Sequence, residues 1–394
     1  MEKVFITGVG IVSALGKDVD SCLNSLKNSI TGIRKAKHFE SKYTSTLLFG
    51  EVDLSTVDLK KTTDSLHEKG VTRSTLLAYL ACQEAINMAK IDTEGIQSIT
   101  TGLISASTVG GMCNTEELYA DANKNDEPSD FLETYAGGDH ILALAKKFGV
   151  RGFTTCINTA CSSSANAIML GARLIKSGRA KRVIVGGTDS LAKYTVNGFN
   201  SLMILSQSPC RPFDEKRDGL NLGEGAGYLI LEAESVCENK KKLAELIGYG
   251  NSNDAHHPSA TSAEANGPQL AMKRALETAG INPAEIDYIN AHGTGTVNND
   301  ETELFAFNQI FETIPPYNST KSYTGHTLAA SGSIEAILSL MSMQEGEVYP
   351  SLNCENPIGE APIQIIKKLD TIKNIMSNSF GFGGNCTSLI LKKV

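Results

Sequence analysis

The sequence of 394 residues contains no pair of cysteines spaced C-x-x-C, and its nine cysteines are scattered and odd in number. Structural zinc sites and disulfide frameworks need grouped or paired cysteines. The scatter argues against both and favours reduced thiols in a cytoplasmic setting. We therefore expect neither a metal site nor a disulfide framework.

Long apolar runs are also missing. No stretch approaches the roughly 20 residues that a membrane-spanning helix needs. The first residues, MEKVFITGVGIVSALG, lack the cationic region and the small-residue cleavage site of a signal peptide. They have the pattern of a first strand, and we expect no membrane segment.

Basic residues are in deficit. The 36 Lys and Arg residues are outnumbered by 44 Asp and Glu residues, which gives a formal net charge of -8. Binding to a phosphate backbone depends on an excess of positive charge. The balance argues against general nucleic-acid binding, and an acidic protein partner would need a local basic patch.

The chain alternates apolar, β-rich runs with Ala- and Leu-rich helical segments, which predicts an α/β fold with mostly parallel sheets. Its length exceeds the roughly 150 residues of a typical domain. A charged run at 238–242 (ENKKK) marks a surface segment near the middle. We predict two halves, residues 1–243 and 244–394. The clearest segments are strands at Val4–Val12 and Arg182–Gly187, helices at Thr72–Lys90, Asp139–Phe148, Cys161–Ser177 and Ala329–Gln344, and closing strands at Asn374–Ser379 and Ser388–Lys392.

The first motif with chemical potential is T-A-C-S-S-S at 159–164, directly before the Ala-rich helix. A helix N-terminus carries about half a positive charge, which lowers the pKa of a nearby thiol. Its free N–H groups can also bind an oxyanion. Cys161 is therefore a candidate nucleophile. The alternative is a buried cysteine that packs as a small hydrophobe.

Two histidines stand in glycine-flanked turns: His292 in A-H-G-T-G-T and His326 in K-S-Y-T-G-H. A histidine of this kind, taken alone, is more often a structural residue. A further motif, F-G-F-G-G at 380–384, holds three glycines in five residues. This predicts backbone with positive φ or close to a ligand, or else a tight turn into the last strand.

Two other patterns carry less. Gly8-Val9-Gly10 follows a strand as in a dinucleotide-binding motif, but Ser13 occupies the third glycine position. His256 and His257 lie next to Asp254, yet a histidine pair in a loop is more often a surface feature than a metal site.

Taken together and in this order, T-A-C-S-S, A-H-G-T-G-T, K-S-x-x-G-H-T-x-A-A-S-G and N-S-F-G-F-G-G resemble the motifs of the elongating β-ketoacyl-acyl carrier protein synthases of the thiolase superfamily. The segment from Arg211 (RPFD) to Gly227 (GEGAG) is similar to the same family's central region. The resemblance covers essentially the whole chain. It implies two related βαβαβ halves in five layers, α-β-α-β-α, and a dimer across an edge strand.

The resemblance also implies roles. Cys161 would accept the acyl group, with its own N–H and that of Phe382 as the oxyanion hole. His292 and His326 would act as two neutral donors to the enolate that malonyl decarboxylation leaves. Lys321 would support the site by pairing with Glu303. Phe380 and Phe382 would form a gate, and Val109 would line the acyl tunnel.

The implied reaction is a decarboxylative Claisen condensation with malonyl-acyl carrier protein, without a cofactor. Two alternatives stay open from the sequence. One is a ketosynthase-like partner subunit of a heterodimer, and the other is a CoA-dependent thiolase. The partner expected in every elongation reaction is acyl carrier protein, with a homodimer or a heterodimer as the assembly.

Some residues depart from the family's pattern. The loop Ser206–Cys210 is shorter than usual and lacks the basic residue that typically meets the carrier, so docking would depend on other cations such as Lys69 and Arg73. Val297 stands where Pro is common, and Asn385-Cys386-Thr387 replaces the usual Thr-Asn and small residue. These departures hint at a secondary pathway.

Overall fold

The computed structural model describes residues 2–394 except 125, 128 and 133. Among these residues, ten strands follow one another in the order β3-β2-β4-β5-β1-β6-β12-β11-β7-β8. The two halves of that order meet where β1 and β6 share two residue pairs, Phe5 with Glu245 and Ile6 with Ala244. The strands are β1 Val4–Ser13, β2 Thr101–Ala106, β3 Thr154–Ile157, β4 Arg182–Asp189, β5 Gly225–Ala233, β6 Ala244–Asn253, β7 Tyr288–Asn290, β8 Tyr317–Asn318, β11 Asn374–Phe380 and β12 Asn385–Lys392.

Each half repeats one topology. Numbered within its half from the outer edge inwards, the order is 3-2-4-5-1 in both. The outer three strands are parallel and the inner two antiparallel in each case. Strands β5 and β12 run against both of their neighbours, so four of the five strands described in each half point the same way, and the prediction of mostly parallel sheets holds for strand direction. The repeat supports two halves meeting at 243/244, and that boundary stays a prediction.

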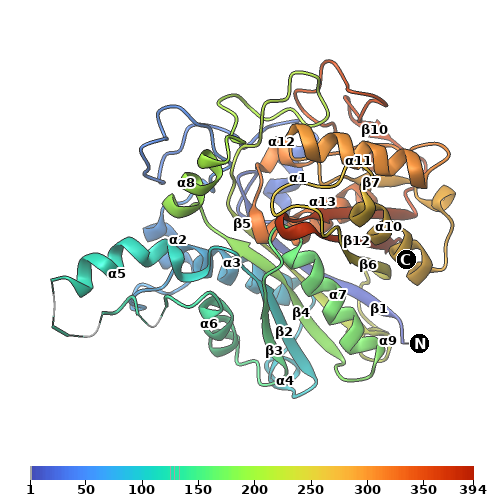
Figure 1. Cartoon of the computed structure of the whole chain (residues 1–394). Helices are drawn as coiled ribbons and strands as arrows, with labels where there is room; N and C mark the ends of the chain where they lie inside the picture. Colours follow the sequence, from blue (N-terminus) through green and yellow to red (C-terminus); the bar gives the residue numbers. More distant parts are fainter. Residues whose placement is uncertain (1, 125, 128, 133) are drawn as a thin grey trace.

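Helices cover the sheets in five layers, as expected. Helices α3 and α6 pack on the outer face of the first sheet, α7 and α13 lie side by side between the sheets, and α10 and α11 cover the second sheet (Figure 1). The helices are α1 Val19–Lys27, α2 Thr56–Thr62, α3 Arg73–Met88, α4 Thr93–Gln97, α5 Thr115–Ala122, α6 Asp139–Phe148, α7 Ser163–Lys176, α8 Lys193–Ser201, α9 Glu234–Cys237, α10 Asn266–Ala279, α11 Val297–Ile310, α12 Lys321–Thr324 and α13 Ser331–Glu345.

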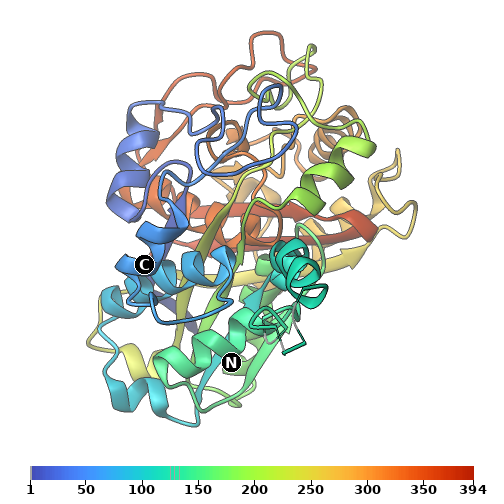
Figure 2. The ribbon, with the colours of Figure 1, turned by 90° about the vertical axis from the view of Figure 1, so that its left-hand side faces the viewer.

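Short elements complete the chain. In the part of the chain that the structure describes, four 3-10 turns and a two-stranded sheet connect the larger elements. They are η1 Gly110–Asn114, η2 Pro283–Glu285, η3 Leu328–Ala330, η4 Phe382–Gly384, β9 Glu347–Val348 and β10 Lys367–Lys368. Figure 2 shows the ribbon turned by 90° about the vertical axis. In the described residues no helix combines the length and the apolar character that crossing a bilayer requires.

Gly8 and Gly10 serve packing. A Cβ added at Gly8 would lie 2.3 Å from the Ala85 carbonyl oxygen, and one at Gly10 would lie 2.0 Å from that of Ala81. Strand β1 therefore approaches the backbone of α3 too closely for a side chain. In the second half, Gly248 and Gly250 meet α10 in the same way. The G-V-G pattern is thus explained by close packing of a strand on a helix.

The middle layer positions two of the sequence motifs. Both of its helices begin at the same edge of the sheets, and the segment before each one contains a motif residue: Cys161 precedes α7, and His326 precedes η3 and α13. The residues on these helices are almost all buried. The two motifs are therefore held by the most rigid part of the core.

Candidate active site

Cys161 lies in a tight turn between β3 and α7. The preceding residue, Ala160, has φ +54°, a left-handed conformation that is unusual for a residue with a side chain. The turn is fixed because the Thr159 N–H donates to Ser163 Oγ at 2.8 Å. The helix begins at Ser163, two residues later than predicted. The thiol thus lies just before the helix. We call the segment 159–162, which carries the thiol, the nucleophile loop.

Burial works against ionisation of this thiol. Desolvation raises the pKa of Cys161 to about 11, while the charge of Lys321 and the N–H of Phe382 act in the opposite direction. The expected lowering of the pKa by the helix N-terminus is therefore outweighed by burial. In the site without substrate, Cys161 is a neutral thiol that accepts a hydrogen bond from Phe382.

His326 has a tautomer that its surroundings determine. Its Nδ1 accepts a hydrogen bond from the Leu328 N–H at 3.0 Å, so Nδ1 carries no proton and Nε2 carries one. Burial and the charge of Lys321 lower the pKa of His326 well below its usual value. The ring is therefore neutral and presents an N–H donor.

His292 has the same arrangement with a different partner. Its Nδ1 lies 3.2 Å from Lys321 Nζ, which also donates to the His292 carbonyl oxygen at 2.6 Å. An ammonium group only donates, so Nε2 of His292 carries the proton. Burial, then Lys321 and His326, lower the pKa of His292 well below its usual value.

The predicted pairing of Lys321 with Glu303 is wrong. Lys321 donates to Glu335, and both side chains are buried. Glu303 instead accepts the backbone N–H groups of His292 and Gly293, each at 2.8 Å. Burial raises the pKa of each carboxyl to about 7; Lys321 opposes this at Glu335, and the two N–H groups oppose it at Glu303. Glu303 therefore holds the histidine loop, while Glu335 holds the lysine.

The thiol and the two imidazoles share one site. Cys161 Sγ and a ring nitrogen of each of His292 and His326 all lie within 4.8 Å of one another. The two rings are nearly perpendicular, with centroids 5.6 Å apart. The structure thus brings together three residues that are 34 to 165 positions apart in the sequence.

A Cys-His-His set could in principle bind zinc. In metal sites, however, the second nitrogen of the histidine usually donates to an acceptor. Here the second nitrogen of His326 faces the Leu328 N–H, and that of His292 faces the Lys321 ammonium. Placing a metal on Nε2 would move a proton onto Nδ1, against these donors. The hydrogen bonds at the two Nδ1 atoms therefore favour two Nε2–H donors beside a thiol over a metal site.

The glycine-rich segment lies against the nucleophile loop. A Cβ added at Gly381 would lie 2.7 Å from the Thr159 carbonyl oxygen and 3.1 Å from the Cys161 nitrogen, so only glycine allows this approach. Phe380 lies 5.8 Å from His292, centroid to centroid. The Phe382 ring stacks on Phe199 of α8 at 5.7 Å.

A partly buried amide network, which sequence analysis missed, ties this segment to the nucleophile loop. Asn385 Oδ1 accepts from Ser162 Oγ at 2.7 Å, from Asn166 Nδ2 at 2.8 Å and from Asn251 Nδ2 at 2.9 Å. Asn166 also donates to Thr159 Oγ1 at 2.8 Å. Asparagines inside an Ala-rich helix and directly after a glycine run were the available signal.

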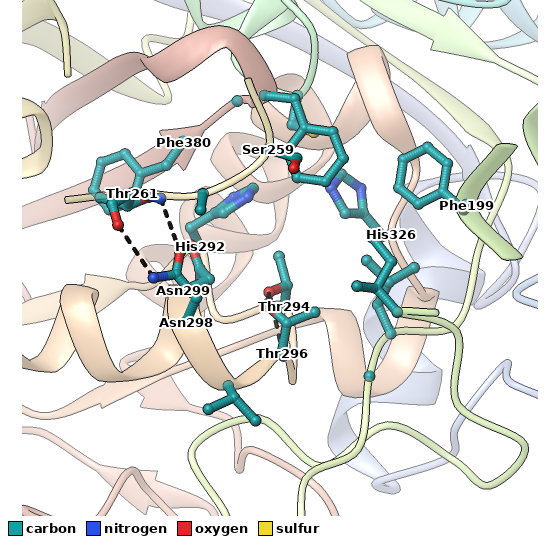
Figure 3. A pocket seen from close by; sticks show the side chains of 18 of the residues that line it. Phe199, Ser259, Thr261, His292, Thr294, Thr296, Asn298, Asn299, His326 and Phe380 are labelled. Atoms are coloured by element: carbon teal, nitrogen blue, oxygen red, sulfur yellow. Dashed lines mark hydrogen bonds between the residues drawn. The ribbon is translucent and has the colours of Figure 1, made fainter. Parts of the chain in front are cut away.

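A cavity of about 270 Å³ leads from Cys161, His292 and His326 to the surface. Its lining is mainly apolar, with threonine and asparagine side chains on one wall (Figure 3). Thr294 and Thr296 join their hydroxyl groups at 2.8 Å. Near the surface, Asn298 forms two hydrogen bonds with the backbone of Thr261, at 2.8 and 3.1 Å, and so holds the loop that carries His257 (Figure 3).

Other predicted residues lie elsewhere. Val109 is buried in an apolar cluster with Leu191, Val196, Leu220 and Leu328, and it does not line the cavity. Arg73 is bound to the buried Glu224, with its side chain 15% exposed, so the prediction of a docking role for Arg73 is wrong. Lys69 is exposed and pairs with Asp130.

The short loop Ser206–Cys210 folds inwards behind the site. The Cys210 N–H donates to Asn221 Oδ1 at 2.7 Å, and the Cys210 thiol lies 3.3 Å from the Lys321 carbonyl oxygen. Both ends of the loop are buried. His256 and His257, set aside as metal ligands, lie in the loop on the far wall, where His257 contributes to the cavity lining.

Comparison with known proteins places the chain in a family. Residues 1–236 match the family described as "Beta-ketoacyl synthase, N-terminal domain", and residues 243–355 match "Beta-ketoacyl synthase, C-terminal domain". The chain therefore belongs to the β-ketoacyl synthase family, a class of acyltransferase enzymes with the thiolase-like fold.

Relatives match along their whole length. The 3-oxoacyl-acyl-carrier-protein synthase 2 of Staphylococcus aureus is 33% identical over 414 residues, covering 100% of this chain and 98% of its own. That of Synechocystis is 33% identical over 412 residues, with the same coverage. The structure of the ketosynthase ApeO in complex with its chain length factor ApeC from Xenorhabdus doucetiae matches at TM-score 0.85 and 32% identity, covering 100% and 98% of the two chains.

Proposed function

We propose that the protein condenses an acyl group held on Cys161 with a malonyl group held by acyl carrier protein, releasing CO2, without a cofactor. The observation that carries this proposal is the cluster of one thiol and two imidazoles whose Nδ1 atoms both face donors. Two neutral N–H donors beside a nucleophile suit a reaction that forms an enolate next to an acyl-enzyme.

The first step is acyl transfer. Cys161 sulfur attacks the carbonyl carbon of an acyl-carrier thioester, forming a new C–S bond. The N–H groups of Cys161 and Phe382 bind the oxyanion. The hydrogen bond that the Phe382 N–H donates to the Cys161 thiol supports this role for Phe382. The carrier's C–S bond breaks, and its sulfur leaves with the proton that Cys161 gives up.

The second step is decarboxylation and condensation. His292 and His326 donate Nε2–H to the thioester oxygen of the malonyl group. The bond to the carboxylate breaks, CO2 leaves, and its electron pair forms the enolate that the two donors stabilise. The enolate carbon attacks the acyl group, a C–C bond forms, and Cys161 leaves as a thiolate that takes a proton from water.

The acyl chain needs apolar space beyond Cys161. Leu220 lines the cavity and also belongs to the apolar cluster around Val109. Phe199 lines the cavity too, and its side chain packs against that cluster. We assign the acyl path to this cluster, which opens when Phe199 and Phe382 separate. The gate role of Phe380 and Phe382 and the tunnel role of Val109 belong to this proposal.

The assembly we propose is a dimer across β3. This strand ends the sheet order, and its four residues are only partly buried. The adjacent Phe153 is 47% exposed and Leu142 is 67% exposed. An open edge with apolar neighbours supports pairing with a second subunit. A homodimer is our proposal, and a heterodimer with a related chain is the alternative.

The setting we propose is the cytoplasm, supported by nine free cysteines. The pathway is chain elongation in fatty-acid or polyketide and polyene synthesis. The altered residues at the gate, Asn385 and Cys386, and at the cavity entrance, Val297, support a secondary pathway over a housekeeping one.

A CoA-dependent thiolase is the rival that the same fold allows. A thiolase needs a second cysteine as its base, and Cys386 lines the cavity. Its thiol bonds to the Gly384 carbonyl oxygen at 3.5 Å, and burial raises its pKa. Such a thiol is a poor base, which favours the decarboxylating reaction. A non-catalytic partner subunit would not require the Cys161 cluster.

The deciding experiment offers the purified protein an acyl-carrier protein and malonyl-carrier protein. We expect an acyl adduct on Cys161 by intact mass, CO2 release and a β-ketoacyl product. Cys161→Ala should lose the adduct and reduce condensation by about 10³-fold or more, since the nucleophile is gone.

Cys237→Ala is the matched control, because Cys237 lies in α9, outside both the cavity and the cluster around Val109. Absence of any adduct, or an adduct that persists in Cys161→Ala, contradicts the proposal. Cleavage of acetoacetyl-CoA without malonyl turnover would establish the thiolase instead.

A further inference from the structure

The entrance of the cavity carries exposed apolar side chains. Met203 is 88% exposed, Val297 is 54% exposed, and both line the cavity from opposite halves of the chain. Leu202, next to Met203, is 46% exposed. We call Leu202, Met203 and Val297 the mouth patch. Large exposed apolar side chains that gather at one opening mark a contact surface more often than scattered ones do.

The backbone turns Met203 outwards at a cost. Helix α8 ends at Ser201, Leu202 is its C-cap, and Met203 follows with φ +56°. Glycine is the usual residue in this left-handed position after a helix. A methionine in this conformation is less favourable than a glycine, because its Cβ crowds the backbone. Its flexible, polarisable side chain is well suited to contact a partner.

Positive charge is missing from the lining of the cavity. Among the described residues that line the cavity there is no Lys or Arg, and the one carboxylate is Asp218. Arg217, beside it in sequence, is buried against Asp300 and Glu301. Arg73 is bound to Glu224. An acidic surface placed on this opening would meet Asp218 and no lining cation.

We propose that acyl carrier protein docks on the mouth patch chiefly through apolar contacts, with its own apolar side chains covering Met203, Leu202 and Val297. This rests on the proposed function, because the substrate arm is attached to the carrier and must enter past these residues to reach Cys161. The carrier therefore covers the rim whenever the arm is inserted.

The test compares Met203→Gly, Met203→Lys and Ile99→Ala. The glycine suits the backbone at 203 and removes only the side chain. Ile99 is 76% exposed but lies by α4, at the end of the first sheet away from the site (Figure 1), so its variant controls for loss of an exposed apolar group. Each variant is assayed with acyl-carrier protein and with an N-acetylcysteamine thioester, which has no protein to dock.

We expect Met203→Gly and Met203→Lys to raise KM for the carrier substrate about tenfold, the loss of roughly one interface contact. Turnover of the N-acetylcysteamine thioester and the behaviour of Ile99→Ala should stay at the native level. KM of the native protein for carrier should change little between about 50 and about 300 mM salt, because screening weakens charge contacts far more than apolar ones.

Three results would overturn the docking proposal: a Met203→Gly variant equal to Ile99→Ala, tighter carrier binding in Met203→Lys, or a steep rise of KM with salt. In each of these the native protein still turns over substrate. A native protein that turns over neither substrate contradicts the proposed function itself, so the two failures are distinguishable.

Discussion

The floor and the mouth of the cavity are built in opposite ways. On the floor, His292, His326 and Lys321 are at most 2% exposed, and each has hydrogen-bond partners that determine its proton position. At the mouth, Met203 and Val297 are exposed side chains without such partners. The floor leaves little freedom to groups that perform chemistry, whereas the mouth keeps adaptable surface for a macromolecule that comes and goes.

The largest effect we expect from a floor residue comes from His326→Ala. Removing one of two enolate donors should lower malonyl decarboxylation about 10²- to 10³-fold. Acyl transfer to Cys161 should remain measurable, because that step uses backbone donors. CO2 release and intact mass separate the two steps.

His257→Ala is the control for His326→Ala, since His257 lines the same cavity near its entrance. Its decarboxylation rate should match that of the native protein. Equal loss of acyl transfer and decarboxylation in His326→Ala would mean that the histidine is structural, and the comparison between floor and mouth would fail.

The buried pair on the floor should matter for stability as well as for rate. Glu335→Leu leaves the Lys321 ammonium without its carboxylate, and we expect the free energy of unfolding to fall by about 3–5 kcal/mol. Urea denaturation measures this change. Glu301→Gln, which breaks an ion pair whose carboxylate is 59% exposed, should cost less than about 1 kcal/mol.

The double variant Lys321→Met with Glu335→Leu separates stability from positioning. It should recover most of the lost stability, since no buried charge is left. Decarboxylation should stay low, because the His292 ring has lost the donor that determines its tautomer. A double variant with native decarboxylation would show that Lys321 has no positioning role.

Sequence reasoning found the motifs because each is local. A thiol before a helix, a histidine between glycines and a glycine run are visible in a few adjacent residues. The partner of Lys321 was not local: Glu303 and Glu335 both lie in helices that follow a histidine, and only the fold decides which one reaches the ammonium. A single carboxylate in the apolar stretch 331–343 was a signal for Glu335.

Burial explains the other differences. The helix start suggested a lowered pKa for Cys161, whereas the desolvation that raises it depends on the whole surrounding core. Arg73 was expected at the surface because nothing nearby in sequence indicated Glu224, 151 positions away. Helix α8 was missed because its short sequence, KYTVNGFNS, is rich in residues of low helix propensity, including glycine, asparagine and β-branched residues. This helix forms the mouth, where local patterns were least informative.

A smaller effect is expected where gate and nucleophile loop are joined. Asn385→Ala removes one acceptor from three donors that each keep another acceptor, so the lost hydrogen bonds should cost about 1 kcal/mol each at most. We expect lower thermal stability and a slowing of Cys161 acylation by about tenfold as the loop loses its position.

Asn385→Asp is the matched variant, since all three bonds use Oδ1 as acceptor and a carboxylate keeps that oxygen. It should retain more acylation than Asn385→Ala. Acylation relative to malonyl decarboxylation is the informative readout, because general destabilisation would lower both. Equal behaviour of the two variants would remove Asn385 from the link between gate and nucleophile.

The smallest expected effect concerns the pH dependence of the decarboxylation rate, to which protonation of His292 and His326 should add no acid limb. Burial holds the pKa of His292 and His326 well below 6.5, so both rings stay neutral as the pH falls through that value. The unfolded chain then binds more protons at these two groups, and their contribution to stability falls below about pH 6.5. The raised pKa values of Glu303 and Glu335, about 7, act in the opposite direction, because the folded chain binds more protons between about pH 4.5 and 7.

Stability is therefore a poor indicator of the protonation state of the two histidines. The rate of malonyl decarboxylation in short assays is the better indicator. From about pH 7.5 to about pH 5.5 we expect the rate profiles of the native protein and of His326→Asn, whose amide donor does not titrate, to have the same shape. An inflection near pH 6.5 in the native protein that His326→Asn lacks would show that the floor is open to protons, and the contrast with the solvated mouth would then be wrong.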